Sequence, residues 1–122
     1  GEPIEVFNGG DMNRDFTYID DIIQGVLAAL DHVPDTAVPA RVYNLGNHRA
    51  EKLTDFIAML EDALGMKAEV ILLPMQQGDV QSTFADIKAS RRGLGFEPTT
   101  AIKDGIPKFI AWYRQYHGNL HG

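Results

Sequence analysis

Residues 14–31 read RDFTYIDDIIQGVLAALD and carry a clear helical pattern. The aliphatic residues of this stretch recur at i, i+3, i+4, i+7, i+8 and i+11: Ile19, Ile22, Ile23, Val26, Leu27 and Leu30. This spacing places them on one continuous face of an α-helix. Asp20 and Asp21 fall in the first turn, where carboxylates favour the positive end of the helix dipole. We therefore predict a helix from about residue 19 to residue 31, preceded by a short extended run over 16–18.

Arg14 stands directly before this run, at the mouth of the preceding loop. Its planar guanidinium group matches the oxygens of a phosphate or a carboxylate, so one interpretation is a contact with an anionic ligand. The other is a surface ion pair with Asp15 or Asp11, which would contribute little to stability. The stretch by itself leaves both interpretations open.

On the N-terminal side, residues 3–7 alternate in polarity and predict a short strand with one buried face. The sequence Asn-Gly-Gly-Asp at 8–11 follows as a loop, in which glycine permits positive φ and close approach of a ligand. A plain hairpin turn explains the glycines equally well. The chain begins at Gly1 rather than Met, already at the entrance to this strand, and we interpret it as the start of a fragment.

On the C-terminal side, we predict a strand over 41–47, a helix near 52–64 that Gly65 stops, and a largely buried strand over 68–73. A short helix should follow from Asp86 to about Arg92.

The last helix begins either at a Thr100 cap, with a kink at Pro107, or at Pro107 itself. Its expected apolar face comprises Ile106, Phe109, Ile110, Tyr113 and Tyr116. The alternation of strands and helices along the chain predicts an α/β fold.

Composition excludes several classes of function. With 17 acidic and 11 basic residues, the net charge of -6 argues against a nucleic-acid or anionic-membrane partner. The absence of cysteine rules out disulfides and thiolate metal sites, and fits a cytoplasmic protein. No apolar run approaches the roughly 20 residues of a membrane span. We expect no metal site, because Gly118 separates the suitably spaced His117 and His121.

The RDFTYIDD sequence followed by an aliphatic helix resembles the signature of extended short-chain dehydrogenases/reductases that act on nucleotide sugars. Several segments together resemble the C-terminal part of one branch, the UDP-glucuronate 4-epimerases: residues 14–21, 42–47, 60–65, 73–86 and 109–113. The most specific of these is Pro-Met-Gln-Gln-Gly-Asp-Val at 74–80.

The resemblance implies an α/β chain that is the C-terminal substrate-binding portion of such an enzyme and lacks most of the Rossmann domain. Residues 14–50 would pack on or join the missing domain, and residues 51–122 would form a small substrate lobe. The implied reaction interconverts UDP-glucuronate and UDP-galacturonate, with NAD accepting and returning a hydride.

The residues for that chemistry are not in this chain. No glycine-rich GxGxxG or GxxGxxG loop lies between a strand and a helix, and none of the four tyrosines has a lysine four residues later. We therefore predict that this chain holds no catalytic residue, binds no NAD and is inactive alone, whereas the full-length parent binds NAD.

The same resemblance implies the substrate contacts. Arg14 would contact the UDP pyrophosphate, Val6 and Phe7 would hold uracil through backbone and ring contacts, and Asp79 would accept a hydrogen bond from a ribose hydroxyl. Many relatives carry Arg-Pro-Gly-Asp where this chain has Gln-Gln-Gly-Asp at 76–79. Gln76 would therefore bring an amide to the phosphates in place of a cation. Phe7 is explained equally well as a core aromatic.

Two other interpretations stay open. A UDP-glucuronate decarboxylase or a nucleotide-sugar 4,6-dehydratase would share the fold, and a non-catalytic sugar-binding or interaction domain would lack the reaction altogether. The expected partners are a UDP-sugar, the missing Rossmann domain and a second copy in a homo-oligomer.

Overall fold

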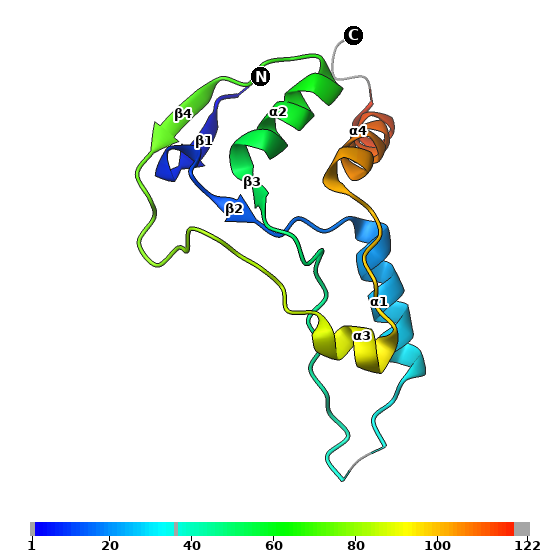
Figure 1. Ribbon diagram of the computed structural model, residues 1–122. Helices are drawn as coiled ribbons and strands as arrows, with labels where there is room; N and C mark the ends of the chain where they lie inside the picture. The colour runs from blue at the N-terminus through cyan, green and yellow to red at the C-terminus, as the bar shows by residue number, and fades with distance from the viewer. Residues whose placement is uncertain (1, 36, 119–122) are drawn as a thin grey trace.

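The computed structural model describes residues 2–35 and 37–118; His121 lies outside the described residues. Its elements follow in the order β1 (Ile4–Phe7), the short 3-10 helix η1 (Asn8–Gly10), β2 (Asn13–Arg14), α1 (Ile19–Asp31), β3 (Glu51–Lys52), α2 (Leu53–Leu64), β4 (Val70–Leu73), α3 (Lys88–Leu94) and α4 (Ile102–His117). Figure 1 shows the strands together with α2 and α4 at one end of the molecule, and α1 with α3 at the other.

The strands form two small sheets. β1 pairs in parallel with β4, so that Val6 lies opposite Leu72 and Phe7 opposite Leu73. β2 pairs antiparallel with β3, which places Arg14 opposite Glu51.

The predicted burial of the strand over 68–73 is wrong. Val70, Ile71 and Leu72 are 41%, 45% and 64% exposed. A parallel sheet buries its strands when layers cover both faces, and β4 pairs with β1 alone among the described strands.

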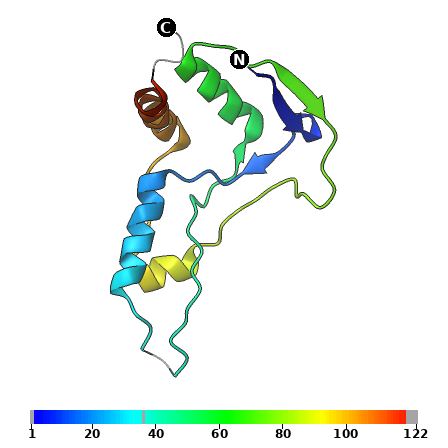
Figure 2. The same ribbon diagram turned by 180° about the vertical axis from the view of Figure 1, so that it is seen from behind.

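The helix predicted from the 14–31 pattern is confirmed as α1, preceded by Tyr18 in an extended conformation. Its inner side carries small residues: a Cβ atom on Gly25 would lie 2.7 Å from a methyl carbon of Leu45 and 2.9 Å from the ring of Phe96. Phe96 forms a buried core with Ile87 and Leu94, against which Ala28 also packs. Both views show α3 crossing the lower end of α1 (Figures 1 and 2).

The aliphatic face of α1 is directed away from this core. Its large side chains are between 43% and 68% exposed: Ile19, Ile23, Val26, Leu27 and Leu30. The helix therefore contacts the core through its small residues, Gly25 and Ala28, and leaves the face with the large aliphatic side chains uncovered.

The predicted strand over 41–47 is wrong. The segment is irregular and Val42 is 90% exposed, although Tyr43 and Leu45 pack against the core. A strand requires a neighbour that accepts and donates its backbone hydrogen bonds, and no described strand lies beside this segment.

α2 is confirmed, and Gly65 ends it in the left-handed conformation at φ 72°. α3 begins two residues after Asp86, whose carboxylate accepts the Lys88 N–H at 3.0 Å. That hydrogen bond lowers the pKa of Asp86. The helix passes through Gly93 and ends before Gly95, which has φ 64°.

α4 begins at Ile102 and contains Pro107 in its interior. The predicted Thr100 cap is wrong, because the N-cap residue is Ala101 and no side chain makes a capping hydrogen bond. The carbonyl of Ala101 accepts the first helical N–H groups, and the Thr100 N–H donates to Asp21. Ile106 and Ile110 are buried as predicted, whereas Phe109 and Tyr116 are exposed.

Among the described residues, no helix is both long and apolar enough to cross a membrane.

Candidate functional site

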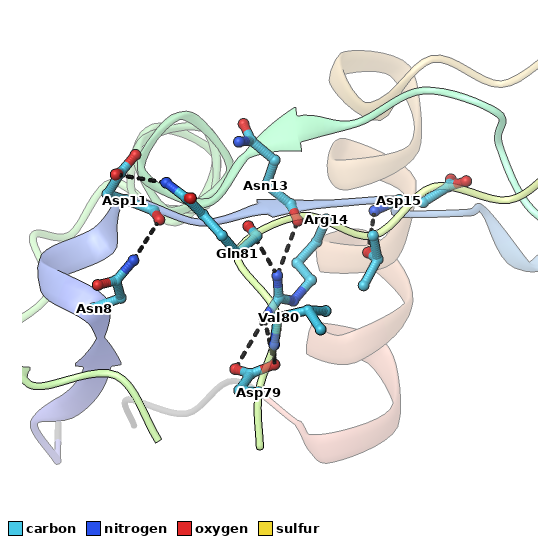
Figure 3. A network of polar contacts seen from close by, with 9 residues as sticks. Asn8, Asp11, Asn13, Arg14, Asp15, Asp79, Val80 and Gln81 are labelled. Atoms are coloured by element: carbon cyan, nitrogen blue, oxygen red, sulfur yellow. Dashed lines mark hydrogen bonds and ion pairs between the residues drawn. The ribbon is translucent and has the colours of Figure 1, made fainter. Parts of the chain in front are cut away.

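Arg14 forms an ion pair with a residue far along the chain. Its Nη2 atom lies 2.9 Å and 3.0 Å from the two carboxylate oxygens of Asp79, 65 residues later (Figure 3). The expectation that Asp15 or Asp11 would be its partner in an ion pair is therefore wrong. The side chains of Arg14 and Asp79 are 24% and 32% exposed, so a ligand can reach both.

Two carbonyl groups hold the other side of the guanidinium group. Arg14 Nη1 donates to the carbonyls of Asn13 at 2.9 Å and Gln81 at 3.3 Å. Asp79 is held as well, because its Oδ1 atom accepts the Val80 N–H at 2.7 Å. The pair therefore has a defined place on the surface.

The loops that carry the predicted contacts leave the same edge of a sheet. β1 ends at Phe7 and β4 ends at Leu73, and the carboxyl ends of parallel strands lie side by side. The 8–10 turn follows β1, and the 74–82 segment with Asp79 follows β4. Ligands of open α/β sheets bind outside the carboxyl ends of the strands.

Val6 and Phe7 differ in their surroundings. Val6 is 4% exposed and belongs to the core, so it can offer a ligand its backbone only. Phe7 is half-buried at the strand end. The following Asn8, Gly9 and Gly10 all have positive φ, between 52° and 84°, which turns the chain sharply away from β1.

Gln76 lies in the same loop as Asp79, and its carbonyl accepts the Asp79 N–H at 3.2 Å. Its side chain is exposed and makes no hydrogen bond within the described part of the chain. The structure thus brings Arg14 and Asp79 into contact, with Gln76 near them in the loop but not joined to the pair.

Asp15 is a residue that the sequence pattern did not single out. Its carboxylate accepts three backbone N–H groups, from Asn47 at 2.8 Å, His48 at 3.1 Å and Ala85 at 2.9 Å. Its own N–H donates to Thr83 Oγ1 at 3.1 Å. Asp15 therefore fastens the Arg14 segment to two distant loops.

Asp21 plays a comparable part at α1. It is 5% exposed, and its carboxylate accepts the N–H groups of Thr99 at 3.2 Å and Thr100 at 3.0 Å. The sequence predicted only that Asp21 lies favourably in the helix dipole. It did not predict that Asp21 links α1 to the segment before α4.

A cavity of about 740 Å³ lies apart from the Arg14–Asp79 pair. Its walls are mainly apolar and include Phe16, Phe56, Leu60, Phe109 and Trp112. Arg14 and Asp79 do not line it, and the charged residues among its lining are Asp20 and Lys108. It offers an apolar surface rather than a phosphate site.

The described residues do not form the glycine-rich turn that binds dinucleotide phosphates. Dinucleotide phosphates bind where a glycine-rich turn leads from a strand into the N-terminus of a helix. Here the glycine turn after β1 leads into β2, and α1 is preceded by Phe16, Thr17 and Tyr18. Within residues 2–35 and 37–118, no group of three or more His, Asp or Glu residues could hold a metal ion.

Comparison with known proteins shows similarity to nucleotide-sugar epimerases. The family model described as the NAD dependent epimerase/dehydratase family matches residues 1–46. An uncharacterised 37.6 kDa protein of the cld 5′ region of Escherichia coli O111:H- is 44% identical over 96% of this chain. UDP-glucuronate 4-epimerase 3 of Arabidopsis thaliana is 41% identical, also over 96% of this chain.

A solved structure shows the same fold. The UDP-glucuronic acid 4-epimerase of Bacillus cereus, in complex with UDP-glucuronic acid and NAD, superposes with a TM-score of 0.80 and 33% identity over 94% of this chain.

The chain spans 39% of the Escherichia coli protein, 30% of the Arabidopsis protein and 36% of the Bacillus chain. It is a mixed α/β chain that matches their C-terminal portion, without the Rossmann part. The chain therefore corresponds to the C-terminal part of the NAD-dependent nucleotide-sugar epimerases, in the extended short-chain dehydrogenase/reductase family.

Proposed function

We propose that this chain is the UDP-sugar-binding part of an NAD-dependent UDP-glucuronate 4-epimerase, which interconverts UDP-glucuronate and UDP-galacturonate. The observation that carries the proposal is the Arg14–Asp79 pair, which joins β2 to the segment that follows β4. A cation there can bind a diphosphate, and an adjacent carboxylate can accept hydrogen bonds from sugar hydroxyls.

For the individual residues we propose the roles that the family resemblance implies. Arg14 contacts the pyrophosphate, Asp79 accepts a ribose hydroxyl, and the backbone of Val6 with the ring of Phe7 holds uracil. Gln76 supplies an amide to the phosphates. The UDP-glucuronate 4-epimerases among the relatives support this reaction over decarboxylation or dehydration.

The proposal includes a division of labour. Residues 14–50 pack on a dinucleotide-binding domain, residues 51–122 form the substrate lobe, and NAD is bound by that other domain. We place the protein in the cytoplasm, for which its cysteine-free sequence is the support.

Activity of the purified chain tests the proposal directly. Residues 1–122 incubated with NAD and UDP-glucuronate should give no UDP-galacturonate, because the chain lacks the glycine-rich loop and the Tyr/Lys pair. The whole gene product should give the epimer under the same conditions. Steady NAD-dependent turnover by the 122-residue chain, or decarboxylated product from the whole protein, would overturn the proposal.

A further inference from the structure

Arg14 is held by partners of two kinds. Its Nη2 atom contacts the partly exposed carboxylate of Asp79, whereas its Nη1 atom donates to the carbonyls of Asn13 and Gln81. A phosphate that approaches from solvent competes most directly with Asp79, because both are anions that suit the same guanidinium edge. Once Asp79 is displaced, the two carbonyl contacts keep the guanidinium group in place.

The two carbonyls differ in their distance along the chain. Asn13 is the neighbour of Arg14 in sequence, whereas Gln81 lies 67 residues later, in the segment after β4. The Gln81 carbonyl also accepts the Asn13 N–H at 2.8 Å. The Gln81 side chain reaches in the opposite direction, and its Nε2 atom donates to Asp11 Oδ2 at 2.8 Å. Figure 3 shows this line of contacts from the turn after β1 to the Arg14–Asp79 pair.

The Asp11 end of the line is itself fixed. The carbonyl of Asp11 accepts a hydrogen bond from Asn8 Nδ2 at 2.8 Å, within the turn that follows β1. The contact between Gln81 and Asp11 therefore links the segment after β4 to the turn after β1. Arg14 contacts the same segment through the Gln81 carbonyl.

We propose that Gln81 is a positioning residue for the diphosphate of the nucleotide sugar. By donating to Asp11, it adds to the Asn13 N–H contact in holding its own carbonyl against Arg14 Nη1, and so helps to set the direction of the guanidinium group. The inference rests on the proposed function, since it requires Arg14 to bind the diphosphate. Gln81 makes no ligand contact in this scheme and acts through Arg14.

The test compares binding of UDP and of uridine to the whole gene product by isothermal titration calorimetry. Gln81→Leu keeps most of the side-chain volume and removes the donor, and should raise the Kd for UDP about five-fold to thirty-fold. The Kd for uridine should change less than about two-fold, because uridine has no phosphate.

Two controls separate positioning from general damage. Gln115→Leu makes the same substitution at an exposed site on α4 and should leave both Kd values unchanged. Asp11→Ala removes the same contact from the other side, so adding Gln81→Leu to Asp11→Ala should change the Kd for UDP little further.

A double-mutant cycle with Arg14→Ala then decides between the mechanisms. If Gln81 acts through Arg14, Gln81→Leu should change the Kd for UDP less than about two-fold in the Arg14→Ala background. Independent, additive losses would overturn the positioning role. If Arg14→Ala alone leaves UDP binding unchanged, the proposed function fails; if Arg14→Ala weakens binding and Gln81→Leu does not, only this inference fails.

Discussion

At the scale of the single residue, the proposed role of Arg14 in binding a charged ligand predicts a cost for its replacement. In the whole protein, Arg14→Ala should weaken UDP-sugar binding by roughly 1.5–3 kcal/mol, the scale of a charge-assisted hydrogen bond lost at an anion. Arg14→Lys should recover only part of this, because an ammonium group cannot form the guanidinium fork.

Titration of each variant with UDP-glucuronate measures the effect, and steady-state kinetics gives the Michaelis constant. If the Kd and the Michaelis constant are unchanged in Arg14→Ala, then Arg14 does not bind the ligand and its ion pair with Asp79 only stabilises the fold. Asp79→Asn provides the complementary variant, since it leaves Arg14 in place while removing the negative charge.

The sequence predicted some residues of this site and not others. Arg14 and Asp79 were singled out as separate ligand contacts, but their direct contact joins positions 65 apart and leaves no periodic trace in the sequence. Asp15 was missed for the same reason, because its partners lie 32, 33 and 70 residues away. A carboxylate that will accept three backbone N–H groups looks like any surface aspartate until the loops are placed.

At the scale of the secondary-structure element, Gly25 of α1 decides how closely the helix approaches the core. In an isolated helix, alanine is more favourable than glycine by about 1 kcal/mol. Here a Cβ atom would lie 2.7–2.9 Å from Leu45 and Phe96, both part of a packed cluster. Overpacking of this kind costs about 1–3 kcal/mol, so we expect Gly25→Ala to lower the free energy of unfolding.

Urea denaturation checks the sign of this effect. Gln24→Ala, at the exposed neighbouring position, is the matched control and should stay within about 0.5 kcal/mol of the original chain. A Gly25→Ala midpoint equal to or above the original would show that helix propensity outweighs packing at this position.

The elements also show which sequence signals suffice. The helical spacing predicted α1 and α2 because each pattern is local, and Gly65 marked an end that depends on its own φ. The 41–47 segment has strand-like composition, but a strand is completed by its neighbours, and the described residues provide none. The start of α4 was ambiguous because its N-cap residue, Ala101, has no side-chain oxygen that could mark the position in the sequence.

At the scale of the whole molecule, the uncovered apolar face of α1 predicts self-association of the isolated chain. Leu27 and Leu30 are 56% and 68% exposed, and Ile19, Ile23 and Val26 extend the same apolar surface. Full burial of each such side chain is worth about 1.5–3 kcal/mol, and patches of this kind normally find a partner. We therefore expect the 122-residue chain to self-associate, with the α1 face of one copy against that of another.

Sedimentation velocity at tens of micromolar should show a concentration-dependent dimer or larger species. Leu27→Glu combined with Leu30→Glu should shift the chain towards monomer, since each carboxylate would have to be desolvated in the interface. Gln24→Glu adds a charge on the same helix at a polar position and should leave association nearly unchanged. A monomer at every concentration, with amides of residues 19–30 protected from hydrogen exchange, would contradict the prediction, because the chain would then cover the face itself.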